Sequence, residues 1–409
     1  MATTYREANQ RKYKFWKSKP VTKLDERVVN SSQIKSGEKL REKYGKNEET
    51  KLPPGYEWRV INVQSDDLAL VTEFLNQNFR EIYVMNITVE RIRWETMGRG
   101  FFVCITKDND ISGCLGITER QVQINSTSQR TGEAIYLCSS TELRETGITK
   151  VLINETIRQA VLAGYEVGSF CDSIIVPSPV ATVRYYTRPL NYKHLKANEF
   201  VGIGEVEDDV AHDRIKIKLR APRSIYLAEK SAENVELVHR LYSEYMNAFN
   251  LHHPLTIEEV ENYFFDDRYV KTIFYEDDNG KVVDFLCYRY FDIINTEREN
   301  TDEKYDNIIR ATSILTYSSN YHRPDILIIN AFKVISSERH HLVYIPDMMG
   351  SNEVILSNVK KTDEDTDDEE ENAMFDQHIM KSRKKQFINL FNWRTPLMTQ
   401  EMVSYLIFN

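Results

Sequence analysis

Apolar residues recur along two stretches of the chain with the same succession of spacings, first helical and then strand-like. Each stretch predicts two helices followed by two strands, and a short polar turn joins the strands. The predicted elements of the first stretch are the helices 68–79 and 89–94 and the strands 101–106 and 111–117; those of the second are the helices 235–249 and 257–264 and the strands 271–275 and 281–290. Residue identity between the stretches is poor, so the repeat is one of pattern, and it indicates two pseudo-symmetric units.

An acetyltransferase-type unit begins with the same succession of helix, helix, strand, turn and strand. Two such units predict an α/β fold in which two pseudo-symmetric, acetyltransferase-like (GNAT-type) halves form one saddle-shaped mixed sheet flanked by helices. The pattern is interrupted near residues 220–224, where a proline lies in an Ala-Pro-Arg-Ser run. We therefore expect three parts: an N-terminal arm over 1–51, a first half over 52–222 and a second half over 223–409.

The composition is that of a globular protein, with 41% of the 409 residues hydrophobic and 28% charged. There is neither a run of about 18 apolar residues nor a signal-peptide core, so no membrane span is expected. The five cysteines are scattered, odd in number and without a CxxC pair. This usage fits buried thiols in a reducing compartment, and we expect a cytoplasmic monomer.

Charge is segregated along the chain, although the net value is only −9. Residues 6–51 are rich in lysine and arginine, whereas residues 361–372 contain eight acids and predict a solvated loop. A decoy for basic substrates is the alternative interpretation of that acidic run. No basic stripe with interleaved aromatic residues is present, and the nine histidines lack metal-ligand spacing. We therefore expect neither nucleic-acid binding nor a bound metal.

Residues 136–164 combine the features of a phosphate-binding segment. A short apolar run leads into a polar loop with Arg144 and Gly147, and the loop leads into a helix that Gly164 ends. A glycine-containing loop at a helix N-terminus directs several backbone N–H groups at one point, where phosphate oxygens bind. Acyl-CoA-dependent acyltransferases hold the pyrophosphate of coenzyme A in this way. The alternative is an ordinary strand–loop–helix connection.

Five motifs are spread over nearly the whole chain. They are YKFWKSKPV at 13–21, LPPGYEW at 52–58, GEAIYLCSSTELR at 132–144, VPSPVATVRYYTRPLN at 176–191 and FNWRTP at 391–396. In kind and order they resemble the motifs of the glycylpeptide N-tetradecanoyltransferase (N-myristoyltransferase) family. The resemblance implies transfer of a myristoyl group from myristoyl-CoA to the N-terminal glycine amine of proteins, by direct attack and without a metal.

The resemblance also implies the role of individual residues. The terminal carboxylate of Asn409 would take the proton from the glycine amine, and the backbone N–H groups of Tyr136 and Leu137 would stabilise the thioester oxyanion. Cys138, beside this oxyanion hole, is expected to be a buried thiol rather than a nucleophile. The implied cofactor-binding residues are Tyr13, Lys14, Phe15, Trp16, Tyr136, Leu137, Cys138, Ser139, Arg144, Glu145, Thr146, Gly147, Ile148 and Thr149. The implied peptide-binding residues are Asp172, Tyr185, Thr187, Ser313 and Tyr344.

The chain departs from the family mainly on the peptide side. The family's pyrophosphate loop is dense in basic residues, but here only Arg144 is basic, so coenzyme A would rely more on backbone amides and the helix dipole. An acidic run after the first helix is absent, and Asp172 adds a carboxylate near the expected amine site. Arg383 and Lys384 replace a Gly-Asp-Gly turn, and the tail that ends at Asn409 is one residue longer.

These departures leave more than one hypothesis open. The first is an active myristoyltransferase with altered peptide preference. The alternative is a degenerate member that binds acyl-CoA or an acylated peptide without turnover. A plain acetyltransferase is a third interpretation, which the C-terminal half disfavours.

Overall fold

The computed structural model describes the chain except for residues 1, 3, 46–47, 80–82, 201–216, 218–219, 299–305, 352–378 and 408–409, and it describes only the backbone of residues 380–384. The predicted acidic loop at 361–372 and the predicted catalytic Asn409 therefore lie outside the described residues.

The described chain alternates helices and strands throughout. The helices are α1 (Tyr5–Asn9), α2 (Lys14–Lys17), α3 (Gly37–Leu40), the π-helix η1 (Arg41–Gly45), α4 (Leu68–Asn78), α5 (Val89–Thr96), the 3-10 helix η2 (Thr141–Leu143), α6 (Ile148–Leu162), α7 (Tyr192–Ala197), α9 (Ala232–Met246), α10 (Ile257–Phe265), α11 (Pro324–Ser337) and the 3-10 helix η3 (Gln400–Met402). The strands are β1 (Ser32–Gln33), β2 (Glu57–Asn62), β3 (Tyr83–Met85), β4 (Gly100–Lys107), β5 (Asp110–Ile124), β6 (Thr127–Ser139), β7 (Val167–Asp172), β8 (Ala181–Pro189), β9 (Ile225–Leu227), β10 (Leu251–His252), β11 (Val270–Glu276), β12 (Val282–Asn295), β13 (Ile308–Tyr317), β14 (Leu342–Pro346), β15 (Met380–Phe391), β16 (Trp393–Arg394) and β17 (Val403–Ser404).

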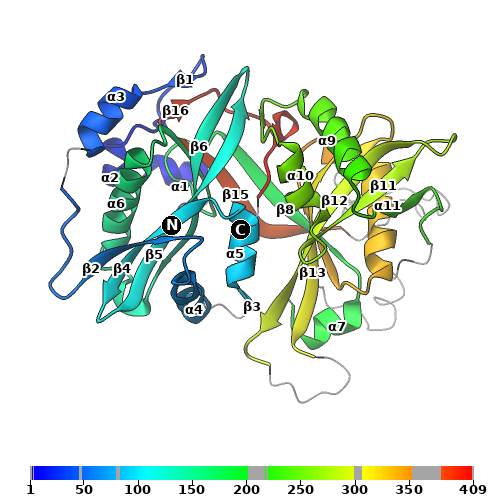
Figure 1. Cartoon of the computed structure of the whole chain (residues 1–409), viewed down its shortest axis with the longest axis horizontal. Coiled ribbons are helices and arrows are strands. Elements are labelled where there is room, and N and C mark those ends of the chain that lie inside the picture. The colour runs from blue at the N-terminus through cyan, green and yellow to red at the C-terminus, as the bar shows by residue number, and fades with distance from the viewer. Residues whose placement is uncertain are drawn as a thin grey trace.

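One 15-stranded mixed sheet runs through the molecule in the order β17-β10-β5-β6-β7-β15-β8-β14-β13-β12-β11-β9, with β4 and β2 continuing from β5 and β3 beside β12. Figure 1 shows α4, α5 and α6 with one group of strands and α9, α10 and α11 with the other. All eight elements predicted for the repeat are present, as α4, α5, β4 and β5 and as α9, α10, β11 and β12. The predicted fold class, two acetyltransferase-like halves in a mixed sheet flanked by helices, is confirmed.

The two halves exchange strands in matched pairs. Strand β3 of the first half pairs with β12 of the second, and β10 of the second pairs with β5 of the first. Likewise β15 pairs with β7, β8 pairs with β14, and β8 and β15 pair with each other at the centre. Each half therefore completes the sheet of the other. The sequence boundary near 222 stays a prediction, because no single break separates the halves in space.

Local chemistry explains where the repeated helices begin. The hydroxyl of Thr88 accepts a hydrogen bond from the first turn of α5, and that of Ser231 does the same for α9. At α10, Thr256 and Glu259 form a reciprocal capping box. Among the helices within the described ranges, none is long and apolar enough to cross a bilayer.

Candidate active site

A β-bulge interrupts β6 at the predicted oxyanion residues. On one side of it Cys138 pairs with Cys114, and beyond it the pairing is displaced by one residue. Tyr136 and Leu137 therefore stand together against a single residue of β5, and Tyr136 has a φ of 55°. A bulge disrupts the ladder and re-aims the groups it carries, and left-handed backbone at a non-glycine residue is concentrated at functional sites. This geometry suits the predicted oxyanion hole.

The side chain of Tyr136 holds the bulge in place. Its hydroxyl donates to the carboxylate of Glu95 on α5, and Arg91 donates to the same carboxylate at 2.9 Å. Glu95 is 2% exposed. Burial, reinforced by the Glu95 carboxylate, raises the pKa of Tyr136 far above its usual range. The hydroxyl therefore remains a donor, and this hydrogen bond fixes the strained backbone from one side.

The loop that follows β6 presents backbone N–H groups to solvent. Within the described parts of the chain, no atom accepts a hydrogen bond from the amides of Glu145, Thr146 or Gly147. Glu145 and Gly147 have φ values of 65° and 86°, and no side chain caps α6. Successive amides at a helix N-terminus make a site for an anion. The predicted pyrophosphate loop thus has the donors that such a site needs.

The only basic side chain of this loop is already engaged with the backbone. The guanidinium of Arg144 donates to the carbonyl of Asn78 at 2.7 Å and to that of Ser139 at 3.4 Å. Arg144 therefore ties the loop to the end of α4. Its contacts agree with the expectation that amides, rather than a cluster of charges, would hold the phosphates.

Replacing Gly147 by alanine is expected to weaken acyl-CoA binding by about tenfold, because a Cβ disfavours left-handed backbone by about 1–2 kcal/mol and so distorts the loop. The added methyl group itself meets no atom within 4 Å. Gly55 is a matched control, since its φ is 83° and its Cβ would also meet open space. Titration calorimetry with a myristoyl-CoA analogue should show weakened binding for Gly147→Ala alone. Equal affinities for the two variants would remove the Gly147 conformation from the binding loop.

The corresponding loop of the second half is occupied by a carboxylate of the protein itself. Asp284 on β12 is fully buried and accepts hydrogen bonds from the three successive backbone N–H groups of residues 320–322 at 2.6–3.2 Å. The ring of His322 contacts the same carboxylate at 2.9 Å. These three amides, between β13 and α11, are thereby satisfied. The two halves share a fold, but the first half alone, in the described residues, leaves this loop available for a ligand.

The remaining predicted cofactor residues flank the loop of the first half. Ser139 ends β6, and Ile148 and Thr149 form the first turn of α6. Ile148 is buried in an apolar cluster under that helix. Cys138 is also buried, and burial raises the pKa of its thiol to about 11. A protonated thiol is a poor nucleophile, which agrees with the structural role expected for Cys138.

The N-terminal arm packs against the first half beside α6. Trp16 stacks on Phe170 of β7 with ring centroids 5.7 Å apart, and Phe15 meets Trp16 edge-on at 5.1 Å. The phenol of Tyr13 donates to a backbone carbonyl just beyond β7 at 2.9 Å. Lys14 begins the short helix α2 between these anchors. The structure thus brings the four predicted arm residues together against the half that carries the loop.

The FNWRTP motif fastens the arm from the other side. The side-chain amide of Asn392 donates to the carbonyls of Lys35 and Glu166, both at 2.9 Å. Its backbone N–H donates to the carbonyl of Pro20 at 2.7 Å. The next residues form β16, which pairs with β1 of the arm. This motif therefore joins the arm to the end of the central strand β15.

The C-terminal tail is buried as far as the structure describes it. Tyr405 and Leu406 are each 1% exposed, and Ile407 is 7% exposed. Ile407 borders a small cavity whose other lining residues are Glu95, Arg120, Glu133, Ala134, Ile135 and Cys171. Several of these residues immediately precede the bulge on β6, so the tail approaches the predicted oxyanion hole. The catalytic role of the Asn409 carboxylate stays a prediction.

Four of the five predicted peptide-binding residues lie together. Thr187 on β8 faces Tyr344 on β14, which in turn faces Ser313 on β13. Tyr185 lies on the same face of β8 as Thr187, and its ring meets that of Tyr344 edge-on at 6.5 Å. Burial raises the pKa of both tyrosines far above their usual range, so both remain neutral hydroxyl groups. Their part in peptide binding stays a prediction.

Asp172 does not join this group. Residues paired across a ladder share a face, and Asp172 pairs with Phe387, which pairs with Thr182. Thr182 and Tyr185 are three positions apart on β8 and so point to opposite faces. The carboxylate of Asp172 accepts a backbone N–H of its own turn at 3.1 Å. Cys171, its neighbour, borders the cavity at the tail instead.

Several residues that shape the site were not predicted from the sequence. They are Glu95, Arg120, Glu133, Asp284 and Asn392. The sequence signal for the first three was faint. Glu95 lies four residues after an arginine on a helix, and Arg120 and Glu133 are charged residues within strands. Both patterns are more typical of exposed faces. Among the residues that the structure describes, no group of three or more His, Cys, Asp or Glu side chains is placed to hold a metal.

The duplicated mixed sheet, with a bulge and an amide loop in one half, defines an acetyltransferase-like fold. Residues 36–183 match the family model described as the N-terminal domain of myristoyl-CoA:protein N-myristoyltransferase. The structure resembles that of Saccharomyces cerevisiae N-myristoyltransferase with bound myristoyl-CoA, with a TM-score of 0.77 and 20% identity over 95% of this chain and 94% of that one. Over these residues and in its fold, the chain is similar to the N-myristoyltransferase family.

The similar curated sequences are distant. The glycylpeptide N-tetradecanoyltransferase of Candida glabrata is 27% identical over 322 residues, which span 71% of this chain and 69% of that protein. The Saccharomyces cerevisiae enzyme is 28% identical over 304 residues, 68% of this chain and 64% of that protein. For the Bos taurus glycylpeptide N-tetradecanoyltransferase 2, the values are 24% over 298 residues, 69% of this chain and 58% of that protein. With two of these three relatives, the match thus spans less than two thirds of the relative's length.

Proposed function

We propose that the protein transfers a myristoyl group from myristoyl-CoA to the N-terminal glycine amine of proteins. One observation carries the proposal. Strand β6 contains a bulge with left-handed backbone at Tyr136, and the loop that follows this strand has three available amides before α6. Relatives named glycylpeptide N-tetradecanoyltransferase and a related structure titled with bound myristoyl-CoA support the acyl donor and the acceptor class.

The chemistry follows from what these groups can do. The amine attacks the thioester carbonyl, negative charge develops on its oxygen, and the N–H groups of Tyr136 and Leu137 stabilise that charge; one such donor is typically worth about 10²–10³ in rate. The C–S bond then breaks, and coenzyme A leaves as its thiolate, with the loop amides and α6 holding its pyrophosphate. The carboxylate of Asn409 accepts the amine proton. Direct transfer needs no covalent enzyme intermediate.

The competing function is binding of acyl-CoA or an acylated peptide without turnover. The loop's dependence on backbone amides and the longer tail favour it. The decisive test is incubation of the protein with myristoyl-CoA and a Gly-initiated peptide, followed by mass spectrometry of the peptide. A mass increase of one myristoyl group on the N-terminal amine is expected. Calorimetric binding of myristoyl-CoA with an unmodified peptide would favour the non-catalytic alternative.

We infer that the enzyme acts in the cytoplasm, as a monomer, on Gly-initiated proteins. All five cysteines are free thiols, and four of them are buried. Such usage is typical of a reducing compartment. Native mass spectrometry would establish the oligomeric state.

This protein is expected to prefer lysine-rich peptides less than an enzyme with acidic substrate-binding loops would. The ratio of kcat/KM for lysine-rich peptides to that for neutral or acidic peptides should therefore be lower. Residues 382–384 form a register shift of β15 directly opposite Tyr185, one of the predicted peptide-binding residues. Arg383 and Lys384 lie in this segment and repel basic peptides. A Gly-initiated peptide library with varied downstream charge would measure the preference. A strong preference for basic peptides would show that other acids attract the substrate.

The charge-reversed variant Arg383→Glu/Lys384→Glu is the matched test of that explanation. It should shift kcat/KM toward lysine-rich peptides while leaving acyl-CoA affinity unchanged. If the preference stays the same in this variant, the two basic residues do not set it.

A further inference from the structure

A buried polar network links the bulge, the tail and the two halves. Its hub is Glu133, which lies on β6 three residues before Tyr136. One carboxylate oxygen of Glu133 accepts a hydrogen bond from the hydroxyl of Tyr405 at 3.1 Å, and the other accepts from Nε of Arg120 at 2.9 Å. Glu133, Arg120 and Tyr405 are each less than 10% exposed. The strand that carries the bulge is therefore bonded directly to the C-terminal tail.

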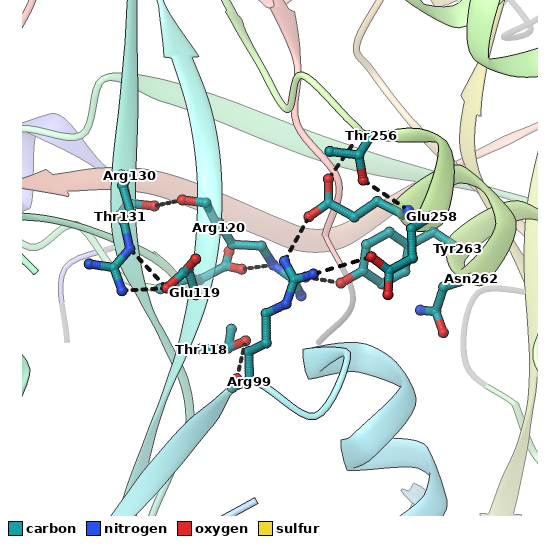
Figure 2. Close-up of polar contacts among 12 residues, drawn as sticks. Arg99, Thr118, Glu119, Arg120, Arg130, Thr131, Thr256, Glu258, Asn262 and Tyr263 are labelled. Atoms are coloured by element: carbon teal, nitrogen blue, oxygen red, sulfur yellow. Dashed lines mark hydrogen bonds and ion pairs between the residues drawn. The ribbon is translucent and has the colours of Figure 1, made fainter. Parts of the chain in front are cut away.

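Arg120 extends the network to the second half and back to the bulge. Figure 2 shows Arg120 on β5 together with Tyr263 of α10, whose hydroxyl it contacts. Arg120 also donates to the backbone carbonyl of Glu95 at 2.6 Å. The side chain of Glu95 in turn accepts the hydroxyl of Tyr136. One guanidinium thus ties together the acid that holds the bulge and the acid that holds the tail.

In the hydrogen bond between the tail and the strand, Tyr405 is always the donor and Glu133 the acceptor. Burial is the main reason that the pKa of Tyr405 lies well above its usual range, so its hydroxyl stays protonated and donates. The tyrosine ring is packed beside the ring of His253, with centroids 4.3 Å apart. Three residues lie between Tyr405 and Asn409 in the sequence. A fixed Tyr405 therefore limits where a terminal carboxylate can reach.

We propose that Glu133 is a positioning residue that, through Tyr405, holds the C-terminal tail in register with the bulge at Tyr136 and Leu137. The proposal rests on the proposed function, because it assigns the network to the placement of the base relative to the oxyanion hole. Reacting groups must be held within about an ångström, and a displacement of that size costs about a hundredfold in rate. Neither Glu133 nor Tyr405 touches the reacting atoms in this scheme.

The test removes one hydroxyl group. Tyr405→Phe keeps the ring and its packing but deletes the donor to Glu133, and it is expected to lower kcat for peptide myristoylation by about ten- to a hundredfold. The KM for myristoyl-CoA should change by less than about twofold, because the predicted cofactor contacts lie in the arm and the loop. Tyr275→Phe is the matched control. Tyr275 is fully buried too, and its hydroxyl donates to a backbone carbonyl on α11, away from the tail.

A second measurement follows the tail without relying on activity. Carboxypeptidase digestion with intact-mass readout should remove residues from the tail at least tenfold faster in Tyr405→Phe than in the parent, whereas Tyr275→Phe should resist as the parent does. Glu133→Ala, which removes both acceptor oxygens, should show the same release. That variant leaves the Arg120 guanidinium without its carboxylate and loses stability, so the tyrosine variant carries the test.

The outcomes separate the two proposals. Lower kcat with faster tail release in Tyr405→Phe supports positioning by Glu133. Unchanged kcat, or lowered kcat with parent-like tail resistance, overturns it. The parent protein could fail to acylate the peptide while the Tyr405→Phe variant still loses its tail residues faster than the parent. That result would refute the proposed function but retain the link between Glu133 and the tail.

Discussion

Removing Phe408 and Asn409, or adding several residues after Asn409, is expected to lower the turnover of glycine-amine acylation by about a hundredfold or more, the scale of a lost general base. The preceding residues of the tail are buried beside the cavity that adjoins the bulge. Two carboxylates, Glu95 and Glu133, border that cavity, but each forms an ion pair with an arginine. Acyl-CoA affinity should barely change, because the predicted cofactor contacts lie in the arm and the loop. Steady-state kinetics and calorimetry on the same proteins measure both quantities.

Shortening the chain by Asn409 alone refines this prediction. It gives the tail length that the motif resemblance implies and leaves a carboxylate on Phe408. Turnover equal to that of the parent would show that the register of the chain end is loose. If extension by several residues also preserves turnover, the carboxylate role is wrong. Asp172, the carboxylate that the sequence placed near the expected amine site, would then be the next candidate base, but it lies on the opposite face of the sheet from Tyr185, so the register disfavours it.

The repeated elements could be predicted because each buries one regular face, and a regular face leaves a local period in the sequence. The helices α4 and α9 and the strands that follow them are of this kind. The amide loop was predicted from its glycine-containing connection to a helix, and the oxyanion role of Tyr136 and Leu137 from motif resemblance, but the bulge itself was not predicted. Periodicity has no signal for a single extra residue opposite Leu115.

The strand exchange and the buried ion pairs could not be predicted in the same way. Pairing of β8 with β15 joins segments some 200 residues apart, and such pairing depends on the whole fold. Arg120 and Glu133 look like solvent-facing residues of their strands, and only the packing of α10 and the tail over them makes them buried. The role of Asp284 likewise could not be predicted, because its hydrogen bonds form only when the fold brings the loop before α11 next to it.

Loss of the N-terminal arm is expected to weaken binding of a myristoyl-CoA analogue by about ten- to a hundredfold, equivalent to about 1.4–2.7 kcal/mol. Trp16 is the anchor whose removal should reproduce most of this loss. Its ring stacks on Phe170 and packs with apolar residues of α6 and of the segment 391–396, and its carbonyl accepts the ammonium of Lys23 at 2.9 Å. Without that ring the short helix α2 keeps too little apolar contact to stay docked, because four residues cannot hold a helix alone.

Calorimetry should therefore show weakened binding for both Trp16→Ala and the protein lacking residues 1–20. Tyr226→Ala is the matched control, since this aromatic residue lies on the edge strand β9 of the second half and is 39% exposed. Its affinity should equal that of the parent. The truncated protein should still fold, because α6 and β7 keep the rest of their packing in the first half. Equal affinity for the truncated and parent proteins would show that the arm packs beside the site without holding the acyl donor, and binding would then rest on the loop of residues 145–147 and on α6.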